Sequence, residues 1–215
     1  DLCLASSKES EKNLNILGAK NVKFLGNIKF CAEVKSKNYS IFSKLEKYNF
    51  WCAASTHEGE EIFFLKTQML LMKNNKKFKT IIIPRHINRS EKILSLSKRL
   101  NLKAKIFNDL SEEMNDYDVL IINSVGDMVK YYSLCRSIFM GKSLVKKLIK
   151  VGGQNPIEPA KCGCKIYHGP YVSNFEEIYN FLASRGITTK LNEEKDLEKN
   201  LLKNYNKNNE LKYNN

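Results

Sequence analysis

The chain has 215 residues, of which 42% are hydrophobic and 27% are charged, and its formal net charge is +13. This composition is ordinary for a globular protein with a sizeable core. No stretch approaches the roughly 20 apolar residues that span a bilayer, and no signal segment opens the chain, so a soluble protein is expected. The positive charge predicts an anionic partner, which is a nucleotide, a nucleic acid or an acidic membrane surface.

The first 40 residues predict a strand at "LCLAS", a polar helix, a second strand at "VKFLG" and then a linker. Because the chain opens with Asp1 rather than Met, we expect a piece of a longer protein. Residues 1–38 would be the end of a preceding domain and its linker. Residues 39–205 would form the main domain, and residues 206–215 would be a disordered, low-complexity tail.

From residue 50 onward, short apolar runs alternate with segments of helical period. Strands are predicted at 50–54, 80–84, 104–107, 118–122, 137–140 and 164–167. Helices are predicted at 60–73, 89–100 and 174–185. Such alternation predicts an α/β fold with a doubly wound, mostly parallel sheet covered on both faces.

The cysteine and histidine positions do not predict a metal site. The six cysteines lack the spacing of a disulfide framework or a paired zinc motif, which favours a reducing, cytosolic compartment. Cys162, Cys164 and His168 lack a clear fourth ligand. In "HEGEE", Glu61 stands where a zinc-protease helix needs its second histidine.

Ligands of open α/β sheets bind where the strands end, so the turns after the strands are the candidate site. In "AASTHEGEE" (53–61), Ser55 and Thr56 are expected to cap a helix whose N–H groups would bind phosphate or carboxylate, beside His57. An ordinary helix start with Glu60 and Glu61 in its first turn is the alternative.

Two further turns carry candidate binding groups. In "PRH" (84–86), Pro84 ends a strand and brings Arg85 and His86 to the same edge, where an arginine suits phosphate. In "NSVGDM" (123–128), Gly126 and Asp127 start a helix and expose backbone to a base or ribose. A surface arginine and a plain glycine turn are the alternatives.

The stretch "GGQNPIEP" (152–159) predicts a built loop. Gly152 and Gly153 would allow the backbone to approach a ligand closely, and Asn155 would cap a short helix that begins at Pro156. The carboxylate of Glu158, one turn in, can accept two hydrogen bonds from the vicinal hydroxyls of a ribose. A capped helix with a solvent-facing glutamate is the alternative.

In this order, "GNIKF", "AASTHEGEE", "PRH", "GDM", "GGQNPIEPAKCG" and "GPYVSNFEE" resemble the C-terminal domain of the 3-deoxy-D-manno-octulosonic acid (Kdo) transferases, over about 17–185. The resemblance implies a GT-B glycosyltransferase that moves Kdo from CMP-Kdo onto the lipid A precursor in Gram-negative bacteria. It implies an inverting, metal-independent reaction without a cofactor, at the cytoplasmic side of the inner membrane with peripheral membrane contact and no nucleic-acid partner. The catalytic base would lie before residue 1, so this chain alone would bind donor without transferring Kdo.

The resemblance also implies the donor-binding residues. They are Ser55, Thr56, His57, Arg85, His86, Gly126, Asp127, Met128, Ser143, Gly152, Gly153, Asn155 and Glu158. Glu158 would hold the ribose of CMP.

The chain departs from the family pattern in two places. Lys142 replaces the second of two glycines before "SL", and the stretch from 144 to 152 is longer than expected. In that stretch Lys146, Lys147 and Lys150 interleave with apolar residues, which suits contact with a membrane or an anionic substrate, or a plain amphipathic insertion.

Two other functions fit parts of the sequence. The GT-B architecture serves many nucleotide sugars, so another donor is possible. The charge also suits a nucleic-acid binder, which needs exposed aromatic residues among basic ones. Phe63, Phe64 and Phe181 lie instead in apolar patterns that predict core packing.

Overall fold

The computed structural model describes residues 2–27, 30, 31, 33, 42–124, 126 and 128–206. It separates into two compact units, Asp1–Lys35 and Ser36–Asn215. The boundary predicted after residue 38 lies outside the described residues. Of the predicted tail, only Asn206 is among the described residues.

The first unit is a strand, a helix and a strand, as predicted. Strand β1 (Cys3–Ala5) pairs in parallel with β2 (Val22–Phe24), and α1 (Lys8–Ile16) connects them. Ser7 caps α1, because its hydroxyl accepts a hydrogen bond from the N–H of Ser10 at 3.0 Å. The helix buries none of its residues.

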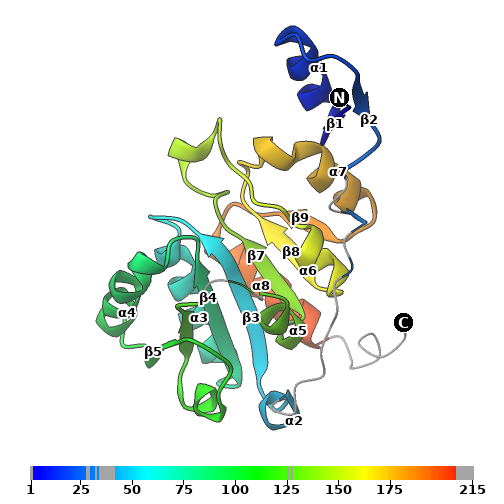
Figure 1. Ribbon diagram of the computed structural model, residues 1–215. Helices are drawn as coiled ribbons and strands as arrows, with labels where there is room; N and C mark the ends of the chain where they lie inside the picture. The colour runs from blue at the N-terminus through cyan, green and yellow to red at the C-terminus, as the bar shows by residue number, and fades with distance from the viewer. Residues whose placement is uncertain are drawn as a thin grey trace. The chain divides into compact units, whose positions relative to one another are not determined.

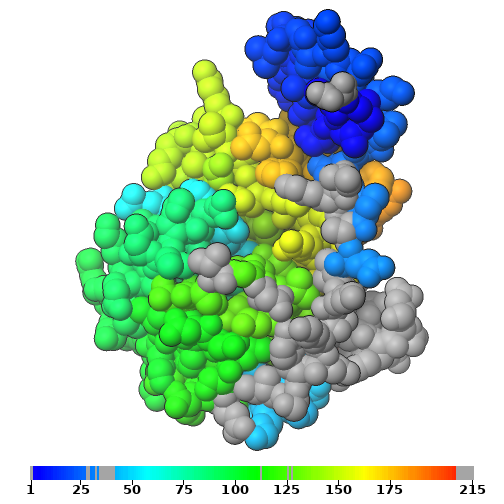
Figure 2. Space-filling model, viewed as in Figure 1, coloured from blue at the N-terminus to red at the C-terminus, as the bar shows by residue number. Residues whose placement is uncertain are grey.

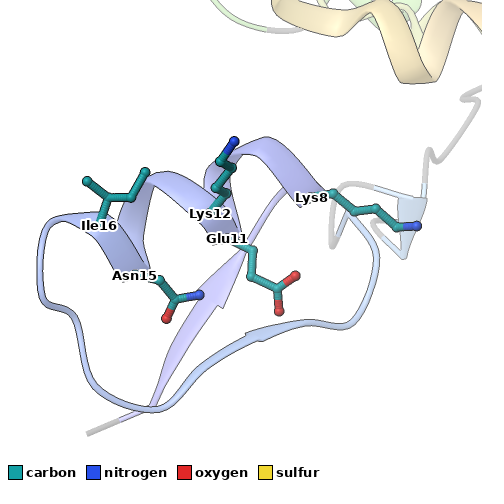
Figure 3. A pocket seen from close by; sticks show the side chains of 5 residues that line it. All are labelled: Lys8, Glu11, Lys12, Asn15 and Ile16. Carbon is teal, nitrogen blue, oxygen red and sulfur yellow. The ribbon is translucent and has the colours of Figure 1, made fainter.

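One face of α1 borders an open hollow (Figure 3). Its lining residues are Lys8, Glu11, Lys12, Asn15 and Ile16. The one carboxylate among them, Glu11, accepts a hydrogen bond from the N–H of Phe24 at 3.2 Å. Since Ile16 is 72% exposed, the hollow is an uncovered helix face rather than a built polar site.

The second unit is built on a seven-stranded sheet in the order β5-β6-β4-β3-β7-β8-β9 (Figure 1). The strands are β3 (Asn49–Thr56), β4 (Phe78–Pro84), β5 (Ala104–Phe107), β6 (Val119–Ile122), β7 (Ser137–Met140), β8 (Lys165–His168) and β9 (Thr188–Lys190). Neighbouring strands all run parallel. The six predicted strands are confirmed, and β9 is an addition.

Helices cover both faces of this sheet, which confirms the doubly wound prediction. One face carries α3 (Glu61–Asn74), α4 (Ser90–Arg99) and α8 (Glu194–Asn206). The other carries α2 (Phe42–Leu45), α5 (Val129–Leu134), α6 (Ile157–Lys161) and α7 (Glu176–Ser184). Short 3-10 turns η2 (Ile87–Arg89), η3 (Glu112–Asp116), η4 (Lys146–Leu148) and η5 (Ser173–Phe175) punctuate the loops. No helix in the described ranges is both long and apolar enough to cross a membrane.

The two cores follow from the alternation of side chains along the strands. Trp51 and Ala53 of β3 face the α3 side, whereas Phe50 and Cys52 face the α5 side. The predicted burial of Phe63 and Phe64 is confirmed.

The predicted burial of Phe181 is wrong, because this side chain is 46% exposed. Tyr179 and Leu182 occupy the core-facing positions of α7 instead. The guanidinium carbon of Arg185 lies 3.7 Å from the centroid of the Phe181 ring, and this stacking covers part of the outward ring.

Candidate functional site

The sheet changes direction of winding between β3 and β7. From β3 the chain continues to β4 on one side, and later returns to place β7 on the other side. Open α/β sheets bind their ligands in the crevice at such a switch point, outside the carboxyl ends of the strands. The loops after β3, β4, β6 and β7 therefore bring the predicted site segments to one edge (Figure 1).

Glu60 joins the two loops that flank the switch point. Its side chain is 0% exposed. Oε2 accepts hydrogen bonds from the backbone N–H groups of His57 at 2.9 Å and Lys142 at 2.7 Å. Oε1 accepts from those of Ser143 at 2.7 Å and Leu144 at 2.9 Å. This carboxylate therefore occupies a nest of amides that would otherwise suit an anion.

The neighbouring carboxylate of Glu61 is also buried, at 2% exposure, and is paired with Arg89. Nε and Nη2 of Arg89 each lie 3.1 Å from an oxygen of Glu61, a bidentate arrangement. Nη1 of Arg89 lies 3.3 Å from Glu58. These contacts tie the start of α3 to the turn before α4.

The predicted capping by Ser55 and Thr56 is wrong. Helix α3 begins only at Glu61, and Ser55 instead adopts a left-handed conformation with φ of 55°. A register shift against β4 falls between Ala54 and Thr56, and such a bulge re-aims the strand end. Gly141 fits beside this bulge because a Cβ there would lie 2.7 Å from the carbonyl oxygen of Ser55.

His57 and His86 lie together beyond the ends of β3 and β4. Their ring centroids are 5.9 Å apart. Nδ1 of His57 lies 3.1 Å from the carbonyl oxygen of Ser55, so it carries the proton and leaves Nε2 as an acceptor. Burial lowers the pKa of His57 below 6.5, although the Ser55 carbonyl and the Glu60 carboxylate oppose this shift. His57 is therefore neutral at pH 7.

Arg85 and His86 have exposed side chains at this edge. The backbone N–H of Arg85 donates to the carbonyl of Thr56 at 3.0 Å, which fixes the turn after β4 against the end of β3. Arg85 is therefore exposed at a backbone position that is fixed against the end of β3.

Ser143 does not present its hydroxyl to a ligand, contrary to the expectation from the resemblance. Its side chain is 0% exposed. The hydroxyl donates to the carbonyl of Met140 at 2.7 Å and accepts from the N–H of Gly169 at 2.8 Å. We assign Ser143 a positioning role between the loops after β7 and β8. Lys142 beside it has a φ of 57°, which explains why a glycine suits that position.

Gly152 and Gly153 approach the protein's own backbone rather than an open ligand site, which corrects the prediction. A Cβ on Gly152 would lie 2.4 Å from the carbonyl oxygen of Tyr171. Gly153 has a φ of 98°, and its N–H donates to the carbonyl of Lys142 at 2.7 Å. The two ends of the loop between β7 and α6 and the loop after β8 therefore meet at these glycines.

The predicted short helix after this loop is present as α6, starting one residue later than expected. Asn155 accepts a hydrogen bond from the N–H of Ile157 at 3.1 Å through its side-chain oxygen, while Pro156 is the N-cap residue. Tyr179 donates its hydroxyl to the carbonyl of Gln154 at 3.0 Å and braces the loop. The side chain of Glu158 is exposed in the first turn of α6.

The turn after β6 contains the last predicted group of site residues. Gly126 is exposed with a φ of 126°, a conformation that favours glycine, and Met128 directly precedes α5. Asp127 lies outside the described residues. Ser90 donates to the side chain of Asn123 at 3.0 Å, which links this turn to the start of α4.

His168, at the end of β8, makes folding sensitive to acid. Burial lowers its pKa from 6.5 to about 4, and Lys190 adds to the shift, so the folded protein holds it neutral at pH 7. Below pH 6.5 the unfolded chain takes up a proton that the folded chain cannot hold until pH about 4. We expect about 3 kcal/mol of stability to be lost over this interval.

Urea unfolding at a series of pH values checks this, with His168→Phe as the comparison. The variant retains a ring against Tyr179, whose centroid lies 4.4 Å away. Its unfolding free energy should fall less steeply between pH 6.5 and 4 than that of the parent. Parallel profiles for the two proteins would show that His168 is not the group responsible.

Within the described part of the chain, no group of three or more histidine, cysteine, aspartate or glutamate side chains is arranged to hold a metal ion. The arrangement at the switch point instead offers a guanidinium, two imidazoles and backbone groups. These groups suit a phosphorylated ligand.

No protein-family model matches the chain. The sequences of several named proteins are nevertheless similar to that of this chain. The chain is 26% identical over 197 residues to a 3-deoxy-D-manno-octulosonic acid transferase of Aquifex aeolicus, covering 92% of this chain and 52% of that protein. It is 30% identical to the transferase of the same name in Rickettsia prowazekii, covering 97% of this chain and 45% of that protein. The chain thus spans about half the length of these relatives.

Solved structures agree on the fold. The C-terminal CMP-Kdo binding domain of WaaA from Acinetobacter baumannii matches with a TM-score of 0.68 at 23% identity, over 75% of this chain and 82% of that domain. The S. aureus MnaA–UDP structure matches with a TM-score of 0.57 at 11% identity, over 96% of this chain and 52% of that protein. The resemblance found in the sequence is confirmed: the chain is a relative of the Kdo transferases, and it has the Rossmann-like fold of a GT-B C-terminal domain.

Proposed function

We propose that the chain is the donor-binding part of a glycosyltransferase that transfers Kdo from CMP-Kdo to the lipid A precursor. The observation that carries this proposal is the sequence match to Kdo transferases over 97% of the chain, which takes in the loops at the carboxyl edge of the sheet. The reaction would be inverting and metal-independent. It belongs to lipopolysaccharide biosynthesis in a Gram-negative bacterium, at the cytoplasmic side of the inner membrane.

The proposed donor site uses the exposed groups of the switch-point edge. Arg85 binds the phosphate of CMP, and His57 and His86 contribute hydrogen bonds beside it. Glu158 accepts hydrogen bonds from the ribose hydroxyls, because a carboxylate can accept both. Gly126, Asp127 and Met128 approach the base. Glu60, Ser143, Gly152 and Gly153 hold these loops in place without touching the donor.

The charge that develops on the leaving CMP would be stabilised by Arg85 and by backbone N–H groups. The catalytic base is expected in the domain that precedes this one in the family, so residues 1–215 are proposed to bind donor without transferring Kdo. The share of each relative that is matched, 52% and 45%, supports a division of the reaction between two halves.

The exposed surface of the first unit supports a division of the enzyme into two halves. Six of its large apolar side chains are exposed, which is unusual for a βαβ element that would normally face a core. They are Leu2 (57%), Leu4 (55%), Ile16 (72%), Leu17 (82%), Leu25 (76%) and Phe30 (39%). We propose that this unit is the end of the N-terminal GT-B domain, whose remaining strands and helices would cover these residues.

Calorimetric titration with CMP, UMP and single-stranded DNA at two salt concentrations tests the proposal. We expect weak binding that prefers CMP, and we expect Glu158→Ala to weaken it about 10-fold or more, since two hydrogen bonds to a charged acceptor are lost. Glu177→Ala, which removes an exposed acid from the first turn of α7, is the matched control and should bind CMP normally.

The alternative results are informative. A preference for UMP would indicate another nucleotide sugar as the donor. Salt-sensitive binding of DNA without any preference among mononucleotides would instead indicate a nucleic-acid binder. Equal losses in Glu158→Ala and Glu177→Ala would contradict the proposed ribose contact.

A further inference from the structure

The loop between β7 and α6 projects from the second unit as a basic tip, defined here as residues 145–151 (yellow-green in Figures 1 and 2). Ile149 and Val151 are 53% and 50% exposed, respectively. Lys146, Lys147 and Lys150 are also exposed. The tip contains no acidic residue, so it combines three positive charges with two uncovered aliphatic side chains.

The tip has a built structure. Leu148 is only 7% exposed and anchors it, and backbone hydrogen bonds close the turn at Leu148, Ile149 and Val151. The loop after β8 braces it from the side. Ser173 donates its hydroxyl to the carbonyl of Ile149 at 3.3 Å, and the side-chain amide of Asn174 donates to that of Val151 at 2.9 Å. The backbone of the tip therefore needs little ordering when a partner binds.

We propose that the basic tip inserts into the surface of an anionic lipid bilayer. Lysines attract anionic headgroups, while exposed aliphatic side chains enter the boundary between headgroups and acyl chains. A free nucleotide or phosphate would use the lysines but would leave Ile149 and Val151 in water. The combination therefore favours a lipid surface over a small anion.

The tip lies where contact with a bilayer would serve the proposed transfer reaction, and this step rests on the proposed function. The tip follows β7 at the carboxyl edge of the sheet, next to the loops of the donor site. Its first residue, Val145, contacts the loop after β3, because a Cβ on Gly59 would lie 3.3 Å from the Val145 side chain. Insertion of the tip would hold the donor edge close to a membrane-embedded acceptor.

Flotation of the chain with lipid vesicles tests the proposal. We expect binding to mixed phosphatidylcholine and phosphatidylglycerol vesicles, and little binding to phosphatidylcholine alone. Replacing Lys146, Lys147 and Lys150 by glutamine should weaken partitioning by about fivefold per lysine. The control replaces Lys73, Lys76 and Lys77, which are exposed at the opposite edge of the sheet, and should change partitioning by less than about threefold.

The apolar contribution is tested separately. The double variant Ile149→Ser, Val151→Ser should weaken vesicle binding even though it keeps every charge. Phe181→Ser, which removes another exposed apolar side chain, should not. Equal losses in the tip and control variants, or a parent chain that does not bind anionic vesicles, would overturn the proposal.

Titration with CMP in the absence of lipid separates the two proposals. Tip variants that keep CMP binding but lose vesicle binding support both. A parent chain that binds vesicles through the tip but not CMP contradicts the donor site alone. Thermal unfolding of each variant confirms that the protein is folded in these comparisons.

Discussion

Glu60→Gln is expected to destabilise the second unit by about 3 kcal/mol, although the two side chains have nearly the same shape. Each oxygen of the Glu60 carboxylate accepts two backbone hydrogen bonds. A glutamine has only one oxygen, so its NH₂ group would face two of the four donors. With the side chain 0% exposed, water does not replace the lost acceptor.

Urea unfolding measures this loss, and Glu91→Gln is the matched control. Glu91 is an exposed acid in the first turn of α4, so its replacement should change stability by at most about 0.5 kcal/mol. Hydrogen exchange at the amides of 142–144 should accelerate in Glu60→Gln while the core strands stay protected. Equal stability of the two variants would show that the buried carboxylate does not hold the loops together.

The sequence predicted the sheet well because its strands are short, apolar and separated by periodic helices. It did not reveal β9, α2 or α8, whereas the helix start expected at Gly126 and Asp127 is present as α5. The β9 segment "TTK" has no hydrophobic run, α2 is only four residues long, and α8 buries only Leu197 and Leu201. These elements depend on neighbours that the chain supplies from elsewhere, namely β8 at the sheet edge and the two cores.

The role of Glu60 could not be read from local pattern. An acidic residue before a helix is ordinarily a favourable partner of the helix dipole, and the sequence offers Glu60 and Glu61 only this role, as the alternative to an anion site. Glu60 instead receives three of its four hydrogen bonds from residues more than 80 positions away. These donors are consecutive backbone N–H groups of the loop after β7, and a local pattern around Glu60 does not show which distant N–H groups need an acceptor.

The sequence indicated that another group approaches Gly152 and Gly153 closely, but the group it predicted, a ligand, is not the one found in the fold. Sequence shows that Gly152 and Gly153 permit close approach without showing what approaches. In the fold, Gly152 faces the backbone of the loop after β8 and Gly153 faces that of Lys142. The effect on the site is therefore indirect, through the loop that carries Asn155 and Glu158.

Gly152→Ala is expected to cost about 3 kcal/mol and to weaken CMP binding, because the added methyl group has no space. Its carbon would lie 2.4 Å from the carbonyl oxygen of Tyr171 and 2.7 Å from that of Leu148, and both are backbone atoms. Either Tyr171 in the loop after β8 or Leu148 in the same loop as Gly152 must move. Either movement displaces the segment that leads to Glu158.

Gly163→Ala separates this steric effect from ordinary glycine strain. Gly163 has a φ of 73° but nothing within 4 Å of its added methyl group. We expect it to lose about 1 kcal/mol of stability through its left-handed backbone and to bind CMP normally. Urea unfolding and calorimetry on both variants distinguish the two causes. If Gly152→Ala bound CMP as tightly as Gly163→Ala, the packing of these two loops would not govern the donor site, and Glu158 would be positioned by α6 alone.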